Sequence, residues 1–286
     1  MFFEAGAHNL LIPSPRPIGN LKPAFEKFKV TWMTGVDTLY AGLLQEEWFM
    51  QQPPQLTCSI SGGTALRPST AALWKQHVGT IIEGFGMTET SCAALLHPPI
   101  AQIRQGSVGF ALPATQIKII NDQGEIQPLG EAGELCIRGP QIVAGYLNRD
   151  TETQQTFIDG WLHTGDIAKI DPDGFCYILD RKKDMVNVSG FNVYPNEVEA
   201  VLTEHPDILE AAVIAVPDEQ TGEAVKAFIA TSNPALSIDE VIRYCREQLT
   251  AYKVPKSVDI LTELPKSTVG KILRAELRAR QNVQSA

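Results

Sequence analysis

The stretch Gly84-Phe85-Gly86-Met87-Thr88-Glu89 stands between an apolar run at residues 80–82 and a segment with a helical pattern. Two glycines let a backbone approach a ligand closely, and the Thr88 hydroxyl and Glu89 carboxylate can then face a phosphate and its metal ion. Taken alone, the pattern is more typical of a tight strand-to-helix turn capped by Thr88. The neighbouring segments decide between the two interpretations.

Short apolar runs alternate with helical patterns from the start of the chain to this turn. The expected strands are residues 9–12, 30–33, 56–60 and 80–82, and the expected helices are residues 21–28, 36–48 and 69–77. This alternation predicts crossover connections and a parallel sheet, so the fold class is α/β. Binding loops in such sheets follow the carboxyl ends of strands, where both Ser61-Gly62-Gly63 and the turn at residues 84–86 fall.

The pattern changes after Ser107, where strands are separated by turns instead of helices. Strands expected at residues 116–120, 134–138 and 175–179 predict a small antiparallel or β-barrel-like subdomain. Beyond a charged run at residues 180–184, the chain shows helical patterns at residues 197–204, 238–249 and 271–280 and strand patterns at residues 210–216 and 225–230. We therefore expect two domains, residues 1–180 and residues 181–286, the second a small α+β module.

The composition is that of a globular protein with an acidic balance. The 286 residues include 33 acidic and 24 basic side chains, and the net charge of −9 argues against a nucleic-acid-binding protein. The five scattered cysteines form no Cys-x-x-Cys pair, so neither a disulfide framework nor a zinc site is indicated. No apolar run reaches the ~20 residues of a membrane span, and the first residues are unlike a signal peptide, so we expect a cytoplasmic protein.

Two further motifs carry groups that suit a nucleotide. In Trp161-Leu162-His163-Thr164-Gly165-Asp166, the carboxylate of Asp166 could accept hydrogen bonds from both hydroxyls of a ribose, whereas His163 is interpreted as structural. Lys271 follows a glycine at a helix start and offers a point charge to phosphate or carboxylate oxygens. A Walker A loop is excluded, because Pro265 and Ile272 stand where it needs Gly and Ser or Thr. Each motif alone is more typical of a turn aspartate or a solvated lysine.

In this order and spacing, the motifs resemble the adenylate-forming enzymes, a superfamily of acyl-CoA synthetases, luciferases and peptide-synthetase adenylation domains. The matching stretches are residues 61–63, 84–89, 133–139, 161–166, 180–194 and 265–271. Within the superfamily, Asp180-Arg181-Lys182-Lys183-Asp184-Met185 and Ser189-Gly190-Phe191-Asn192-Val193-Tyr194-Pro195 are similar to bacterial long-chain fatty-acyl-CoA synthetases. The resemblance implies the C-terminal part of a large AMP-binding domain, followed by a small α+β lid.

The resemblance also implies roles for individual residues. The implied adenine pocket comprises Gly62, Gly63, Phe85 and Gly86. Thr88 is expected to contact the phosphate or the substrate carboxylate, Glu89 to hold Mg²⁺, and Lys271 to bridge the acyl carboxylate and the α-phosphate. Asp166 and Arg181 are expected to hold the ribose hydroxyls. Lys183 is expected to be the hinge about which the small domain rotates between the half-reactions. Gly190 is expected to border the pantetheine tunnel.

Enzymes of this type convert a fatty acid and Mg-ATP to an acyl adenylate, which coenzyme A then attacks. ATP or AMP, Mg²⁺, coenzyme A and a fatty acid are therefore the expected ligands, and peripheral membrane association stays open. Aryl or short-chain acids are the alternative substrates, because the chain carries few of the pocket residues that would discriminate between acids.

The family's Ser/Thr/Gly-rich phosphate loop lies upstream of every segment seen here. We therefore expect this chain alone to adenylate poorly, and to self-associate or to act as half of a split ligase with a missing N-terminal half. The alternative is a non-catalytic AMP- or acyl-binding module. Glu89 and Lys271 argue against that alternative, because binding alone would not need them.

Overall fold

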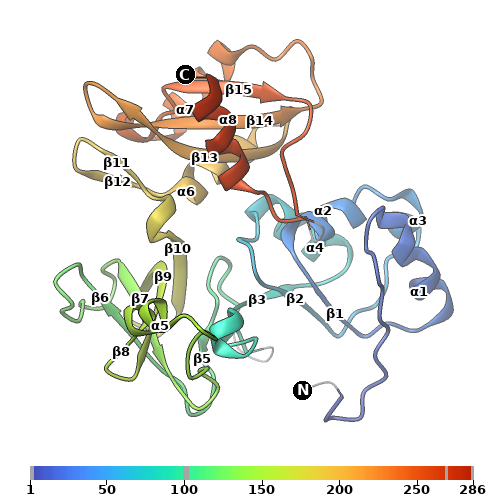
Figure 1. Ribbon diagram of the computed structural model, residues 1–286. Coiled ribbons are helices and arrows are strands. Elements are labelled where there is room, and N and C mark those ends of the chain that lie inside the picture. Colours follow the sequence, from blue (N-terminus) through green and yellow to red (C-terminus); the bar gives the residue numbers. More distant parts are fainter. Residues whose placement is uncertain (1–2, 99–102, 268–269, 285–286) are drawn as a thin grey trace.

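The computed structural model describes residues 3–98, 103–267 and 270–284, and these residues form three sheets (Figure 1). The first sheet and the helices around it form the first module, and the second sheet, in the middle of the chain, forms the second module. The third sheet lies in the C-terminal part, residues 182–284, to which we refer as the lid. The α/β class expected from the alternating patterns is confirmed. In this part of the chain, no helix is long and apolar enough to cross a membrane.

The first sheet combines a parallel half with an antiparallel extension. Its strands, in spatial order, are β1 (Trp32–Gly35), β2 (Cys58–Ser61), β3 (Ile81–Phe85), β4 (Leu95–Leu96) and β5 (Phe110–Ala111). The pairs β1–β2 and β2–β3 are parallel, and the remaining pairs are antiparallel. The helices here are η1 (Ile18–Leu21), α1 (Lys22–Lys27), α2 (Asp37–Leu43), α3 (Glu47–Gln51), α4 (Pro68–His77) and the short η2 (Thr88–Thr90).

Aromatic packing fills the core beneath this sheet. The rings of Tyr40 and Trp74 are fully buried and meet edge to face at 4.7 Å between centroids. Phe49 stacks on the other side of Trp74 at 5.4 Å. The Tyr40 hydroxyl donates to the Ile60 carbonyl at 2.7 Å, so this ring also ties α2 to β2. The parallel strands are thereby held with their carboxyl ends along one edge.

Two expectations for this region are wrong. Residues 9–12 form no strand: Leu11 is exposed and the segment leads into a run containing three prolines, which cannot donate to a ladder. Residues 36–48 are not one helix, because Glu46 takes an extended backbone between α2 and α3. The Glu46 carboxylate accepts the indole N–H of Trp48 at 2.7 Å, which favours this break.

The second sheet is antiparallel and open. Its strands are β6 (Gln116–Ile120), β7 (Gly133–Arg138), β8 (Phe157–Ile158), β9 (Trp161–Ile170) and β10 (Cys176–Arg181), in the order β10-β9-β7-β6 with β8 beside β9. Helix α5 (Asp150–Thr156) precedes β8. Within the described residues the path does not close, so the subdomain is an antiparallel sheet and not a closed barrel.

The lid carries the third sheet and its own core. Its strands are β11 (Val186–Val188), β12 (Phe191–Val193), β13 (Ile208–Asp218), β14 (Gly222–Thr231) and β15 (Ser257–Leu261), and its helices are η3 (Lys182–Asp184), α6 (Pro195–Glu204), α7 (Ile238–Gln248), η4 (Ala251–Lys253) and α8 (Arg274–Gln284). The hairpin β11–β12 and the strand β15, which runs parallel to β14, were not foreseen. The largest buried cluster of the lid draws only on residues 186–258, and a second draws on residues 212–277.

Because these clusters contain no residue before 186, we predict that residues 181–286 fold as an isolated module. Ile229 and Ile260 are register partners on β14 and β15, but Ile229 is fully buried and Ile260 is 40% exposed. Ile229→Ala should lower the free energy of unfolding of the module by roughly 2–5 kcal/mol, and the matched Ile260→Ala should change it far less. Urea titration followed by circular dichroism measures both, and a module without a cooperative transition would refute the prediction.

Candidate active site

Asp166 is directed by an irregularity in β9. Strand β7 pairs regularly with β9 on either side, but its single residue Leu135 faces three residues, 164–166, of β9. Gly165 takes φ +69 there, a conformation that glycine adopts without strain. The Thr164 hydroxyl donates to the Leu135 carbonyl at 2.8 Å and accepts the Asp166 amide at 3.1 Å. An insertion of this kind re-aims a side chain that regular pairing would place elsewhere.

The Asp166 carboxylate is buried and only half satisfied. Across the β9–β10 pair it faces its register partner Arg181, whose Nε lies 3.4 Å from Oδ1. Oδ2 has no hydrogen-bond partner among the described atoms. Burial raises the pKa of Asp166 to about 6, although Arg181 and Lys271 act in the opposite direction. An unpaired, buried acceptor is costly, and a donor such as a sugar hydroxyl would satisfy it.

Lys271 is brought to this carboxylate by a loop of the lid. The segment after β15 descends from the lid to α2 and then rises into α8 (Figure 1). The Lys271 side chain is exposed, yet its pKa is lowered by partial burial and by the charges of Arg181 and Arg274, against the opposing effect of Asp166. The sequence places Lys271 and Asp166 more than a hundred positions apart, and the fold makes them electrostatic neighbours.

Glu89 and Thr88 lie at the end of the first sheet, on and beside η2. The Glu89 carboxylate accepts the Tyr146 hydroxyl at 2.5 Å, and its backbone carbonyl accepts the Val143 amide at 3.0 Å. Thr88 is exposed. The expected cap is made by another residue, because the Thr90 hydroxyl accepts the Met87 amide and donates to the Met87 carbonyl, both at 3.0 Å. Thr88 is therefore free of the capping role that the alternative interpretation assigned to it.

The glycine turns bring two chain segments into close contact. A Cβ at Gly86 would overlap the backbone of Cys92, so only glycine fits this position. A Cβ at Gly62 would lie 3.4 Å from the Gly84 carbonyl oxygen, which places the loop after β2 beside β3. Gly63 takes φ +82 in this loop. Phe85 is half-buried and packs against the core of the second sheet.

Gly190 and Lys183 lie on the lid side of β10. Gly190 forms the tip of the β11–β12 hairpin at φ +89, with no atom of another segment within 4 Å of a Cβ placed there. Lys183 is exposed on η3, the segment that follows β10 into the lid. Lys271 is the lysine of the lid loop whose charge acts on the Asp166 carboxylate.

His163 has a carboxylate neighbour that the sequence did not reveal. Its Nδ1 lies 3.9 Å from Glu134 Oε1 across β7 and β9. Glu134 also accepts the Gly165 amide at 3.2 Å and pairs with Lys182 at 3.3 Å. Glu134 therefore fixes the irregularity in β9 that aims Asp166.

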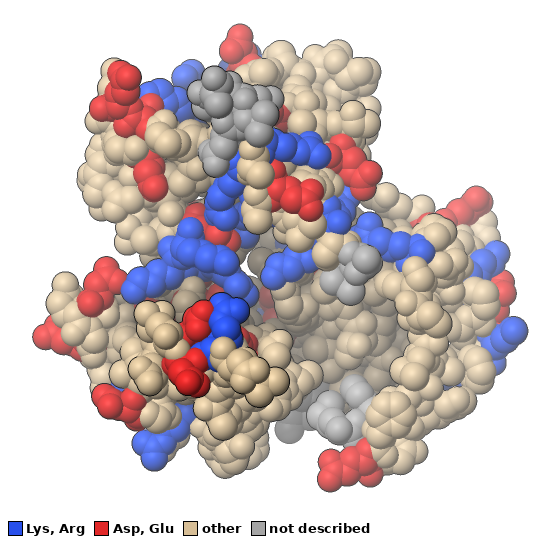
Figure 2. All heavy atoms as spheres, viewed as in Figure 1, with Lys and Arg blue, Asp and Glu red and all other residues tan. Residues whose placement is uncertain are grey.

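The site collects positive charge on a chain that is acidic overall. Figure 2 shows Lys and Arg side chains gathered in a band between the lid and the two modules below it. Partial burial and the positive charges of Arg181 and Arg274 lower the pKa of Lys271. A local cationic surface of this kind favours a polyanionic ligand in spite of a net charge of −9.

Mg²⁺ fits the site only together with a ligand. The described residues contain no cluster of three or more metal-ligating side chains. Glu89 offers one carboxylate that has a single side-chain partner, Tyr146. Mg²⁺ is usually held by one or two carboxylates plus substrate phosphates and water, and Glu89 matches that type of site.

The comparisons with known proteins agree with this geometry. A profile of the AMP-binding enzyme family matches residues 1–147, and a profile of the AMP-binding enzyme C-terminal domain matches residues 197–271. The chain belongs to the AMP-binding enzyme family. A long-chain-fatty-acid–CoA ligase of Salmonella typhimurium strain LT2 is 47% identical over 281 residues, which cover 97% of this chain and 50% of that protein. The chain thus spans about half the length of the curated relatives it matches.

Solved structures of related ligases share the fold. The anthranilate CoA ligase AuaEII, in complex with anthranoyl-AMP, superposes with a TM-score of 0.88 at 33% identity, covering 96% of this chain and 55% of that one. The o-succinylbenzoate CoA synthetase of Bacillus subtilis, in complex with ATP and a magnesium ion, gives a TM-score of 0.80 at 32% identity and covers 91% and 54%.

Several residues of the site were missed by reading the sequence. Tyr146 at Glu89 and Glu134 at Gly165 are examples, and Arg16 and Thr38 at Gly270 are others. No local motif marks them, because each acts through a partner from a distant segment.

A pH titration of stability should reveal the cost of burying Asp166. The folded pKa of about 6 exceeds the unfolded value of 3.8, so the folded chain keeps a proton that the unfolded chain has released. As the pH rises from about 4 to about 6, the free energy of unfolding should therefore fall, and Asp166 alone should account for up to about 3 kcal/mol of that decrease.

Asp166→Asn should remove this part of the pH dependence and leave the chain at least as stable as the parent at pH 8. The exposed turn residue Asp159, changed to Asn, is the matched control and should leave the curve unchanged. Thermal unfolding between pH 4 and pH 8 measures both variants. An identical slope in the parent and Asp166→Asn would contradict the expectation.

Proposed function

We propose that the chain provides the adenylate-handling part of a fatty acid–CoA ligase, in which an acyl adenylate forms and coenzyme A then takes the acyl group. The observation that carries the proposal is the buried, half-satisfied Asp166 carboxylate beside Arg181, on which the charge of Lys271 also acts. Similarity to long-chain-fatty-acid–CoA ligases supports a fatty acid as the substrate. ATP and coenzyme A are the proposed co-substrates.

The first half-reaction joins two anions. The fatty-acid carboxylate oxygen attacks the α-phosphorus of ATP, and the bond from that phosphorus to the pyrophosphate leaving group breaks. Cations aimed at the developing charge lower the barrier most, because they are already oriented when the charge develops. Lys271 is proposed to supply one such cation, and Asp166 with Arg181 is proposed to hold the ribose.

Glu89, oriented by Tyr146, is the residue proposed to hold Mg²⁺. The ion supplies charge neutralisation of the phosphate oxygens when bound. Thr88, exposed beside Glu89, is proposed to contact the same phosphate or the substrate carboxylate. Gly62, Gly63, Phe85 and Gly86 are proposed to border the adenine.

The second half-reaction needs a different arrangement of the lid. The coenzyme A sulfur attacks the acyl carbonyl carbon, and the bond between that carbon and the AMP oxygen breaks. Gly190 is proposed to border the path of the thiol, and here it forms the tip of the β11–β12 hairpin with open space around a Cβ placed there. Rotation of the lid about Lys183 would exchange Lys271 for Gly190, a domain motion that gates each step. The domain division at residues 180 and 181 is part of this proposal.

The two half-reactions can be tested separately. Supplied with a long-chain acyl adenylate and coenzyme A, the purified chain should release equal amounts of AMP and thioester, read by mass spectrometry. Lys271→Ala should leave this step within about threefold, because Lys271 is proposed to serve the other half-reaction. Lys75→Ala, on the exposed face of α4, is the control. AMP binding without any thioester would favour a non-catalytic binding module.

Gly190→Ala should slow the thioester step at least tenfold while AMP affinity is kept, because a methyl group would stand beside the thiol path. Gly222 in the same lid also has positive φ and open space around a Cβ, so Gly222→Ala is a matched control for backbone strain. Both variants should lose about 1–2 kcal/mol of stability. Equal rates in the two variants, measured with supplied acyl adenylate, would exclude a role for Gly190.

A further inference from the structure

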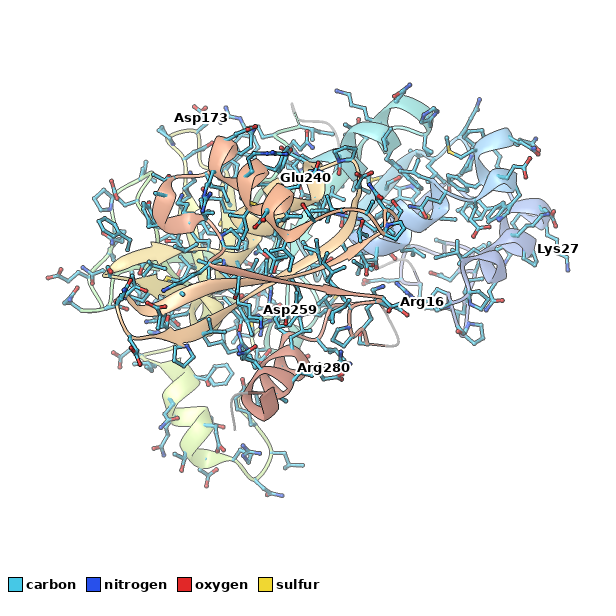
Figure 3. The ribbon with its side chains drawn as sticks, turned by 90° about the horizontal axis from the view of Figure 1, so that it is seen from above. Arg16, Lys27, Asp173, Glu240, Asp259 and Arg280 are labelled. Atoms are coloured by element: carbon cyan, nitrogen blue, oxygen red, sulfur yellow. The ribbon has the colours of Figure 1, made fainter. Side chains whose placement is uncertain are left out.

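Among the described residues, hydrogen bonds link the lid to the first module through two neighbouring residues at the start of α2, Asp37 and Thr38. At the first point, the Thr38 hydroxyl donates to the Gly270 carbonyl at 3.3 Å and accepts Arg16 Nη2 at 3.2 Å. Gly270 takes φ +88, and a Cβ there would lie 2.7 Å from Thr38 Oγ1 and would overlap the Arg16 guanidinium. Only glycine lets the loop dock this closely. Figure 3 shows Arg16 at the boundary between the first module and the lid.

At the second point, Arg67 joins α2 to the lid. Its Nε lies 2.6 Å from Asp37 Oδ2, its backbone amide donates to Asp37 Oδ1 at 3.0 Å, and its Nη1 donates to the Leu209 carbonyl at 2.9 Å. Asp37 is buried at the start of α2, and a buried carboxylate without its cation would be costly. The ion pair with Asp37 therefore holds the Arg67 guanidinium in place.

The Leu209 carbonyl is available because β13 is irregular there. Ile208 pairs with Thr231 and Glu210 pairs with Ala230, so Leu209 is the extra residue of a bulge. A bulged residue leaves the ladder locally unpaired. The sheet of the lid therefore presents an acceptor to Arg67 without losing a regular ladder bond.

Both contacts bear on Lys271. Gly270 directly precedes it, and Arg67 and Thr38 both act at the first turn of α2. We propose that Thr38, Arg16 and Arg67 form a two-point latch, positioning residues that hold the lid in the orientation in which Lys271 meets Asp166. The proposal rests on the proposed function, because it identifies the contacts that must break before Gly190 can replace Lys271.

The contacts suit a latch that opens within a catalytic cycle. The neutral Thr38–Gly270 hydrogen bond contributes roughly a factor of ten in an equilibrium constant, and the charge-assisted Arg67–Leu209 bond roughly a factor of ten to a hundred. Two such links bias an orientation without locking it. The contacts of Arg67 with Asp37 lie inside the first module, so they persist when the Leu209 link breaks.

The test measures lid orientation and needs no turnover. Nitroxide labels at Lys27→Cys and Glu240→Cys, on the first module and the lid (Figure 3), report their separation by double electron–electron resonance. Cys92 is exposed and is changed to Ser in every variant, whereas the other cysteines are buried. The parent should give one dominant distance.

Thr38→Val removes the hydroxyl and keeps the shape, and Arg67→Lys keeps a charge for Asp37 but loses the reach to Leu209. Each should raise the population of a second distance about tenfold, equivalent to about 1.4 kcal/mol. Thr38→Ser should restore the parent distribution. Arg149→Lys, in the second module and paired with Glu152, is the matched control and should match the parent.

Unchanged distances in both Thr38→Val and Arg67→Lys would overturn the latch. If Arg67→Lys does not fold, Thr38→Val with its Thr38→Ser rescue decides alone. AMP binding to the parent, measured by calorimetry, tests the proposed function separately. Altered label distances in the variants without AMP binding by the parent would support the latch and reject the proposed function. Unchanged distances together with AMP binding would reject the latch alone.

Discussion

Buried carboxylates at the end of β10 are the constraint on which the arrangement of this protein depends. Asp180 accepts the Asn196 amide at 2.7 Å at the start of α6, and burial raises its pKa to about 6. Asp184 pairs with Arg278 at 2.6 Å on α8. Removing one partner from such a buried group leaves an uncompensated charge, so these pairs set the direction in which the chain enters the lid. The loop that carries Lys271 leads directly into α8 and inherits that direction.

Arg274 connects this crossing to the chemistry. It binds both carboxylate oxygens of Glu199 on α6, donates to Asn196 Oδ1 at 3.0 Å, and lies three positions after Lys271. The first turn of α8 is therefore tied to α6, so Lys271 moves with the lid as one body. The same cationic group lowers the pKa of Lys271. Structural support and electrostatic tuning thus come from one side chain. Asp166 differs from Arg274, because its unpaired Oδ2 lowers the stability of the fold until a ligand donates a hydrogen bond to it.

Much of the fold could be predicted from residue patterns because the signals were local. The strand at residues 116–120 and the helix α4 follow from apolar periodicity and flanking turns, and their observed bounds differ from expectation by at most one residue. The strand predicted at residues 9–12 is absent, because an apolar run forms a strand only beside a partner strand. Strand β15 was overlooked because its parallel pairing with β14 joins distant segments. Of the candidate site, motifs indicated Asp166, Arg181 and Lys271, whereas Tyr146 and Thr38 had no motif.

The sequence by itself determined the class of the fold and the identities of the charged groups, because glycine turns, periodicity and charge are properties of neighbouring residues. Tertiary structure alone decided which of those groups meet. The irregularity in β9 aims Asp166, the bulge at Leu209 frees an acceptor for Arg67, and the close approach at Gly270 sets the place of Lys271. Each depends on a strand register or on a contact between segments far apart in the chain. The free energy of such contacts depends on both segments, so no local stretch of sequence reveals it.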